Sequence, residues 1–308
     1  MANQFSSAGT ITQDMVDLLD KSIDEIWNRR DEHAGVLARF FDVENKSEGL
    51  SHIITNVGSE LSLPQISQDT EALPYLVPAD GFKQTFNLIN YRSGIRVTDT
   101  VMRADRFDKI LFMASGQIKS GMRKDEYMRA AIFNDAFSGT AGADSLPLCD
   151  NSHPQENPEQ GTWDNLSTGA LTTANLHALR LLARKMTNSQ GDPDPAMPQT
   201  LLIPPDLERE ARELVTSTLD AETNLNTRTV LIGDLELVVS PFLTDTDAYF
   251  LLADRQGQNK GLHEVRLMDW EIGNNSPANV DIKIDKRIKS IKAYGFTTSK
   301  NVYGSAGV

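Results

Sequence analysis

The sequence has little of what marks secreted or membrane-spanning proteins. Its single cysteine, Cys149, excludes an intrachain disulfide framework and is typical of a protein that keeps a reduced thiol. No apolar run approaches the roughly 20 residues that a membrane helix needs. The opening residues, MANQFSSAGT, contain neither a basic nor an apolar segment. We therefore expect no signal peptide, no membrane association and synthesis in the cytoplasm.

Positive charge is also in the minority. The chain has 30 Lys and Arg residues against 43 Asp and Glu residues, a formal net charge of −13. A protein that holds nucleic acid through its overall field needs an excess of clustered cations to neutralise phosphates. The composition excludes that class. The 308 residues, 39% of them hydrophobic, are enough for two ordinary cores.

Two segments, residues 11–30 and 105–137, have apolar residues spaced by threes and fours, which predicts amphipathic helices. The second is the strongest helix signal in the chain, and Gly139 follows it as a natural stop. An amphipathic helix near a chain end must dock on something. We expect residues 11–30 to make most of their apolar contacts with other chains.

Residues 43–90 predict a two-stranded excursion with few residues for a core of its own. β-formers around Ile53 alternate with polar residues, and Pro64 and Pro78 lie in the stretch that follows. An isolated hairpin is marginally stable, so we expect this segment to rest on neighbouring chains. The apolar residues expected to be covered in this way include Leu61, Leu63 and Ile66.

The rest of the chain predicts a mixed α+β fold. Residues 138–170 are rich in Gly, Ser, Asn, Asp and Pro and indicate a long irregular connection, which is unusual in a compact domain. The remaining expected elements are a strand-like stretch 82–101, helices 172–187 and 205–218, strands 200–203, 230–240 and 248–253, and short strands over 261–308.

Cys149, Asp150 and His153 are the most suggestive group for chemistry. One interpretation is a Cys–His nucleophile or half of a zinc site, and the other is a loop cysteine beside a turn histidine. The chain has no CxxC motif, and its other histidines are scattered without ligand spacing: His33, His52, His177 and His263. The missing partners favour the second interpretation, so we assign no catalytic, cofactor-binding or metal-binding residue.

Three further patterns are weaker. Asp245 with Asp247, and Asp192 with Asp194, lack the spacing of a calcium loop and favour turns. The strings SGTAGAD and YGSAG match neither a phosphate-binding loop nor a dinucleotide motif. The basic residues near the C-terminus alternate with Asp281 and Asp285, which favours a solvated strand face over an anion site. These are Lys283, Lys286, Arg287, Lys289 and Lys292.

Several long strings resemble the major head subunits of tailed bacteriophages, in particular those of the Mu-like prophage type. They are AAIFNDAFSGTAGADSLPLCDNSHP (130–154), GTWDNLSTGALTTANLHALRLLARKM (161–186), TLLIPPDLEREARELV (200–215), VVSPFLTDTDAYFLLAD (238–254) and YGFTTSKNVYGSAGV (294–308). The resemblance covers roughly residues 37–308 in order, which makes it more specific than any one short motif.

The resemblance implies the Hong Kong 97 type capsid fold, an α+β fold with an N-terminal arm, an extended E-loop hairpin, a P-domain that holds a long spine helix, and an A-domain. On this sequence, residues 1–42 would form the arm, 43–90 the E-loop, 91–167 the P-domain with the spine helix, 168–259 the A-domain and 260–308 strands that return to the P-domain.

The implied function is structural. Hexamers and pentamers would close an icosahedral shell around phage double-stranded DNA, enclosed without sequence-specific binding, in the virion. Scaffold, portal and cement proteins are the implied partners, besides other copies of the chain. An encapsulin-like nanocompartment shell is the alternative within the same fold. A cysteine-dependent hydrolase that uses Cys149 and His153 is the alternative of another class, and it lacks an orienting third group.

Overall fold

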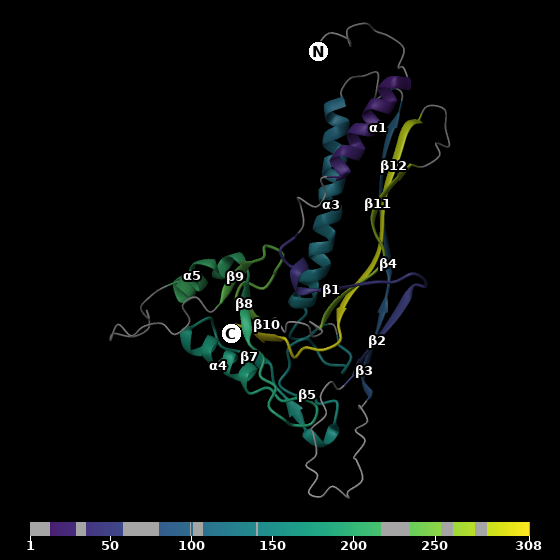
Figure 1. Cartoon of the computed structure of the whole chain (residues 1–308). Helices are drawn as coiled ribbons and strands as arrows, with labels where there is room; N and C mark the ends of the chain where they lie inside the picture. Colours follow the sequence, from purple (N-terminus) through teal and green to yellow (C-terminus); the bar gives the residue numbers. More distant parts are fainter. Residues whose placement is uncertain are drawn as a thin grey trace, which may run out of the picture. The chain divides into compact units, whose positions relative to one another are not determined.

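The computed structural model describes residues 13–28, 35–57, 80–98, 100, 107–139, 141–216, 235–253, 261–274 and 282–307. Contacts divide the chain into two compact units. The first contains the described parts of residues 1–35, 88–125 and 266–292, and the second those of 36–87, 126–265 and 293–308. Both units combine helices with strands (Figure 1), which confirms the prediction of a mixed α+β structure.

In the first unit, two helices pack against one face of a β-sheet. The helices are α1 (Gln13–Asn28) and the N-terminal part of α3 (Phe107–Asn134), which agree with the segments expected from apolar spacing. The strands that this unit contributes are β4 (Ile89–Thr98) and most of β11 (Leu262–Asn274) and β12 (Ile282–Phe296). They belong to a four-stranded sheet with the order β1-β11-β12-β4, in which β1 is Asp42–Asn45. β12 runs antiparallel to β4. At 13 and 15 residues, β11 and β12 are long, so the expectation of short strands was wrong.

The packing of α1 corrects a further expectation. Ile23 lies in a cluster with Ile110 and Ala114 of α3, and Trp27 packs with Trp270 of β11. Ile23 and Trp27 are only 2% and 6% exposed, so the chain buries them itself. Burying an Ile to this extent stabilises the fold by about 1.5–3 kcal/mol. The prediction that this helix makes most of its apolar contacts with other chains was wrong for these two residues.

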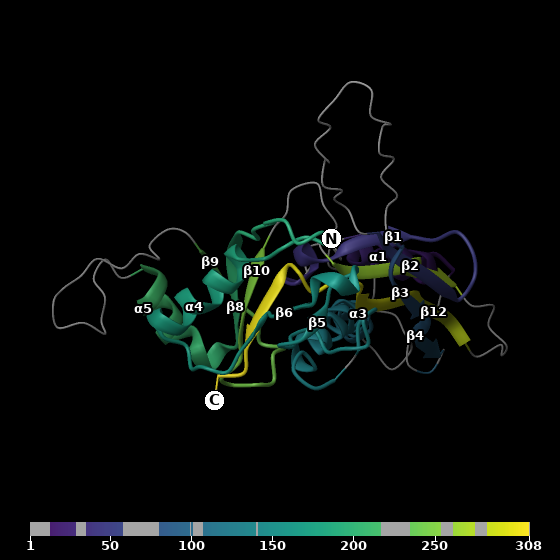
Figure 2. The ribbon, with the colours of Figure 1, turned by 90° about the horizontal axis from the view of Figure 1, so that it is seen from below.

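The core of the second unit surrounds a five-stranded sheet. Its strands, in order, are β7 (Leu166–Ser167), β13 (Val302–Ser305), β10 (Tyr249–Ala253), β8 (Pro198–Ile203) and β9 (Glu236–Val239). Helices α4 (Thr173–Arg184) and α5 (Glu208–Thr216) contribute to the core on one face, and Figure 2 shows both helices beside these strands. The segments expected near 172–187, 200–203, 205–218 and 248–253 are confirmed in type.

Strand β10 is buried on both faces because a hydrophobic cluster packs against each face. Its side chains alternate between two cores: Tyr249 and Leu251 face the cluster that includes α4 and α5, whereas Phe250 and Leu252 face the cluster that includes Phe133 of α3. A strand covered on both sides is expected to be a continuous apolar run, as YFLLA is.

The expected two-stranded excursion is a hairpin of β2 (Ser51–Val57) and β3 (Asp80–Asn87), which pair antiparallel. Ile53 on β2 is 60% exposed, and Leu50 just before it is 63% exposed. Phe86 on β3 is buried instead. Leu61, Leu63 and Ile66, which we expect to be covered by neighbouring chains, lie outside the described residues.

Helix α3 buries a carboxylate in the first unit. Asp125 accepts hydrogen bonds from the Lys292 ammonium at 2.8 Å and from the Trp270 indole N–H at 2.9 Å. Lys292 also lies 2.7 Å from Asp269, and only 1% of its side chain is exposed. Burial of an unpaired charge costs several kcal/mol, so each charge here requires the others.

One turn further along, α3 buries an arginine in the second unit. Arg129 donates to Glu126 and to Glu264 of β11, both at 2.7 Å, and its guanidinium lies over the Tyr294 ring. Glu126 also accepts the backbone N–H of Leu37. Burial disfavours the charged guanidinium, but the carboxylate of Glu264 outweighs this effect, and the pKa of Arg129 is raised.

A third polar group joins β1 (Asp42–Asn45) to the hairpin and to β11. The two carboxylate oxygens of Glu44 lie 3.0 Å from His52 and 3.0 Å from His263. His263 is buried, and its Nε2 lies 2.8 Å from the Thr297 hydroxyl. Burial lowers the pKa of His263, and the neighbouring carboxylates of Glu44 and Asp42 only partly offset this effect.

Replacing Arg129 with Met should lower the free energy of unfolding by about 3–5 kcal/mol, because Glu126 and Glu264 then stay buried without a cation. Urea denaturation measures this loss. Arg123→Met, on an exposed position of the same helix, is the matched control and should change stability by less than about 0.5 kcal/mol. Equal effects of the two substitutions would contradict a structural role for Arg129.

The His263 group predicts a loss of stability in mild acid. The folded state holds the pKa of His263 below its ordinary value of 6.5, so the unfolded chain takes up its proton more readily. The contribution is fully present above about pH 6.5 and is lost as the pH falls below it. Urea denaturation between pH 7.5 and 5 should show a smaller acid loss for His263→Gln than for the unchanged protein. His177→Gln, at an exposed helix position, should leave the pH dependence as it was.

Candidate functional site

The structure places Cys149 in the core rather than in an exposed loop. It is fully buried, and its Sγ faces the backbone of Gly304, where an added Cβ would lie 2.6 Å from the sulfur. Burial raises the pKa of the thiol far above its ordinary value, so the thiolate that a nucleophile needs is disfavoured. His153 does not act as a base toward Cys149, because both of its ring nitrogens face other groups, Asp144 and Ser299.

His153 instead links two parts of the second unit. It lies in β5 (His153–Pro154), which pairs with β6 (Thr162–Trp163), and its ring stacks on Trp163 with centroids 4.5 Å apart. Its Nδ1 lies 2.6 Å from Asp144 Oδ2, and its Nε2 lies 3.3 Å from Ser299 Oγ. Sequence reasoning missed this Ser–His–Asp order because Ser299 follows His153 by 146 residues.

The order of these three groups is that of a hydrolytic triad, but their surroundings exclude a substrate. His153 is fully buried, and Ser299 is 2% exposed. The hollow beside them has a volume of about 10 Å³, which is room for a single water molecule at most. The arrangement therefore satisfies buried polar groups and ties the connection after α3 to the C-terminal strands.

The acidic pairs behave as turn residues. Asp245 Oδ1 accepts the backbone N–H groups of Asp247 and Ala248, which is the geometry of an Asx turn. The Asp194 backbone N–H donates to Met186 in the turn after α4. Within the described ranges, no three His, Cys, Asp or Glu side chains are grouped so that they could hold a metal ion. No helix in the same ranges is long and apolar enough to cross a membrane.

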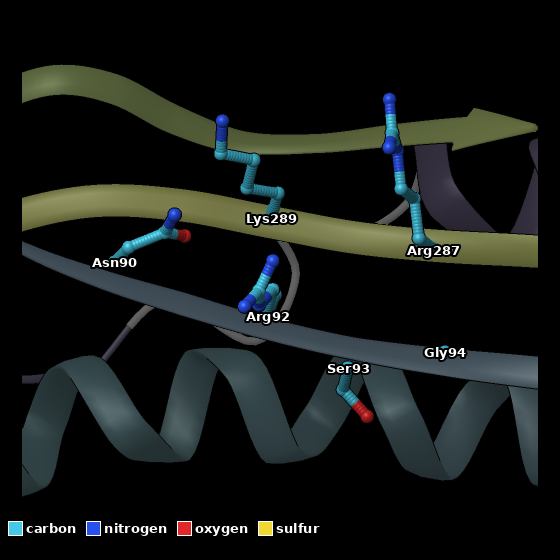
Figure 3. A pocket seen from close by; sticks show the side chains of 6 residues that line it. All are labelled: Asn90, Arg92, Ser93, Gly94, Arg287 and Lys289. Atoms are coloured by element: carbon cyan, nitrogen blue, oxygen red, sulfur yellow. The ribbon is translucent and has the colours of Figure 1, made fainter. Parts of the chain in front are cut away.

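The basic residues of β12 do not form one solvated face, which corrects the sequence-based interpretation. Lys286 is buried and pairs with Asp24 of α1 at 2.7 Å, and Lys292 is buried beside Asp125. Arg287 and Lys289 point to the opposite face of the sheet, where they line a hollow of about 450 Å³ (Figure 3). The side chain of Lys283 lies outside the described residues.

Comparisons with solved structures find the same fold in viral shells. The chain is similar to the capsid protein of the cyanophage P-SCSP1u, with 14% identity, a TM-score of 0.56 and 86% of each chain covered. It is also similar to the virus-like particle from Pyrococcus furiosus, with 11% identity, a TM-score of 0.53 and coverage of 93% of this chain and 98% of that one. The procapsid of bacteriophage JBD30 is similar with 12% identity and a TM-score of 0.52, and the match covers 96% of this chain and 76% of that one.

No curated protein sequence matches the chain. Identities this low establish a common fold and nothing finer. The family follows from a different comparison, in which a model described as phage capsid protein matches residues 83–298. That range covers well over half of the 308 residues and includes α3, both long strands and all strands of the five-stranded sheet except β13. The chain therefore belongs to the phage capsid protein family, whose members are structural proteins and not enzymes.

Proposed function

We propose that the protein is the major head subunit of a tailed bacteriophage of the Mu-like prophage type, with the Hong Kong 97 type fold. Hexamers and pentamers of the chain close an icosahedral shell, and the shell encloses double-stranded DNA without reading its sequence. The observation that carries this proposal is the family match over residues 83–298, which spans the helix and sheet cores of both units. The chain would be made in the host cytoplasm and reside in the virion, with scaffold, portal and cement proteins as partners.

The domain assignment is part of the same proposal. Residues 1–42 serve as the N-terminal arm, 43–90 as the E-loop, 91–167 as the P-domain with α3 as its spine helix, 168–259 as the A-domain and 260–308 as strands that return to the P-domain. Two observations support it: α3 is a single helix of 28 residues, about 42 Å long at 1.5 Å per residue, and β2 with β3 forms a separate two-stranded sheet.

The hairpin is the element that supports assembly best. Ile53 and Leu50 leave most of their apolar surface uncovered in the single chain. Two-stranded hairpins are marginally stable alone, so contact with another copy would both cover these residues and stabilise the strands. Ile53 and Leu50 are therefore expected to lie at an intersubunit contact that repeats around the shell.

A nanocompartment shell is the second candidate, favoured by the likeness to the virus-like particle from Pyrococcus furiosus. The two candidates differ in contents. Particles purified from cells that express the whole phage head operon should contain nuclease-resistant double-stranded DNA if the chain is a phage head subunit. Closed particles that hold a cargo protein and no such DNA would favour the nanocompartment. Negative-stain microscopy with nucleic-acid and peptide analysis of the same fractions distinguishes them.

Replacing Ile53 with Asp should impair assembly while leaving the subunit folded. Burying an Ile contributes about 1.5–3 kcal/mol, and each 1.4 kcal/mol changes an equilibrium constant tenfold. The concentration needed for particle formation should therefore rise at least about tenfold, measured by light scattering and sedimentation.

Ile53→Val is the matched control, because it keeps an apolar, β-branched side chain on the strand. It should assemble at nearly the original concentration. Circular dichroism of both variants checks that the subunit remains folded. Normal assembly of a folded Ile53→Asp subunit would show that this face of the hairpin is not an intersubunit contact.

A further inference from the structure

The hollow in the first unit is lined by cations. Arg92 of β4 and Arg287 and Lys289 of β12 surround it, with Asn90 at one side. Figure 3 shows the three cationic side chains on one side of the two strands, while Ser93 points the other way, toward the helix. Arg92 and Arg287 are exposed and Lys289 is half-buried. The volume of the hollow, about 450 Å³, fits a group of side chains rather than a single small ion.

The pairing of the two strands places like charges in register. Lys289 lies directly opposite Arg92, and like charges at such positions destabilise a sheet. Further along the same two strands, Asp285 lies opposite Arg96 and pairs with it at 3.0 Å. The strands thus use complementary charges at one position and repelling charges at another.

Nothing that the structure describes neutralises this cluster. Arg92, Arg287 and Lys289 form no hydrogen bond or ion pair with any residue in the described ranges. Gly94 lies opposite Arg287, and its missing side chain keeps the hollow open. Three cations that have no ion-pair partner among the described residues, around an open hollow, favour an anionic group from another molecule.

We propose that this hollow is an intersubunit contact that receives exposed carboxylates of a second copy of the chain, a proposal that rests on the shell function. Each copy carries 43 acidic and 30 basic residues, so the surfaces of two copies repel each other in general. A local patch of opposite sign offsets that repulsion and fixes where the copies meet.

Carboxylates suit the hollow better than DNA phosphates do. A duplex presents a charge about every 1.7 Å and is held by extended basic tracks. Here the cluster ends at the Arg96–Asp285 ion pair, where Arg96 already has a carboxylate partner and attracts a continuing phosphate backbone less than an unpaired arginine would. The site is short and bounded, as a contact with a few protein carboxylates requires.

Zero-length crosslinking with a carbodiimide tests the proposal directly, since it joins an amine to a carboxylate that touches it. Particles are assembled from a mixture of isotopically light and heavy subunits and crosslinked, and their peptides are analysed by mass spectrometry. We expect Lys289 to be joined to Asp or Glu of another copy, seen as mixed light–heavy pairs. Lys289→Arg keeps the charge, so this variant should assemble normally and lose the crosslink.

Two results would overturn this inference and leave the shell function intact. The first is closed particles in which Lys289 forms no crosslink to another copy, and the second is particles in which Lys289 is protected from the crosslinking reaction only when DNA is inside. The second would assign the hollow to phosphate. A folded protein that forms no particles under any condition would overturn the shell function and this inference with it.

Charge reversal gives an independent measurement. Arg92→Glu with Lys289→Glu should slow assembly about tenfold at low ionic strength, and added salt should narrow the difference. Lys119→Glu with Arg123→Glu is the matched control, because it makes the same change in net charge at exposed positions of α3. Equal slowing by both pairs would mean that net charge alone matters, and would overturn a specific contact at the hollow.

Discussion

The pairing of the charges that α3 buries is the constraint on which the rest of the fold depends. Within little more than one turn this helix places Asp125, Glu126 and Arg129 out of contact with water. Each finds its partner on a strand far away in sequence, Lys292 of β12 for Asp125 and Glu264 of β11 for Arg129. A slip of either strand by one residue would leave charges buried and unpaired, a penalty of several kcal/mol. A one-residue slip would also turn the buried Ile284 and Ile288 to the opposite face of the sheet, so we infer that the charge pairs and the apolar pattern specify the register together.

Apolar periodicity was sufficient to predict the elements that have one buried face. Helices α1 and α3 follow from apolar spacing in the sequence, although α3 also buries charged residues. Strand β10, which is buried on both faces, is indicated by its continuous apolar run YFLLA. The interpretation was wrong where the buried residues are charged. Lys286 and Lys292 alternate with other polar residues as a solvated face would, and their burial depends on Asp24 and Asp125, 262 and 167 residues away. No local pattern carries that information.

The candidate sites show the same limit. The residues around Cys149 and His153 show no ligand spacing in the sequence, and the partners that His153 has in the structure were not predictable from it. His52 and His263 are likewise far apart in sequence, and the fold brings both to Glu44. Local sequence patterns show which ligands or partners a motif lacks, whereas the hydrogen-bond and ion-pair partners of a buried polar residue are determined by the tertiary structure.

A shell built from acidic subunits has two requirements that no single kind of contact meets. Apolar surface such as that of Ile53 contributes association free energy that salt barely changes, but it is non-directional. Charge complementarity contributes less net affinity and more selectivity, since a wrong approach brings like charges together. With a net charge of −13 on each copy, added salt weakens the general repulsion while it also weakens any local attraction. The exposed Ile53 and Leu50 of the hairpin segment would therefore hold neighbouring copies together. The cationic hollow would select the orientation in which the copies meet.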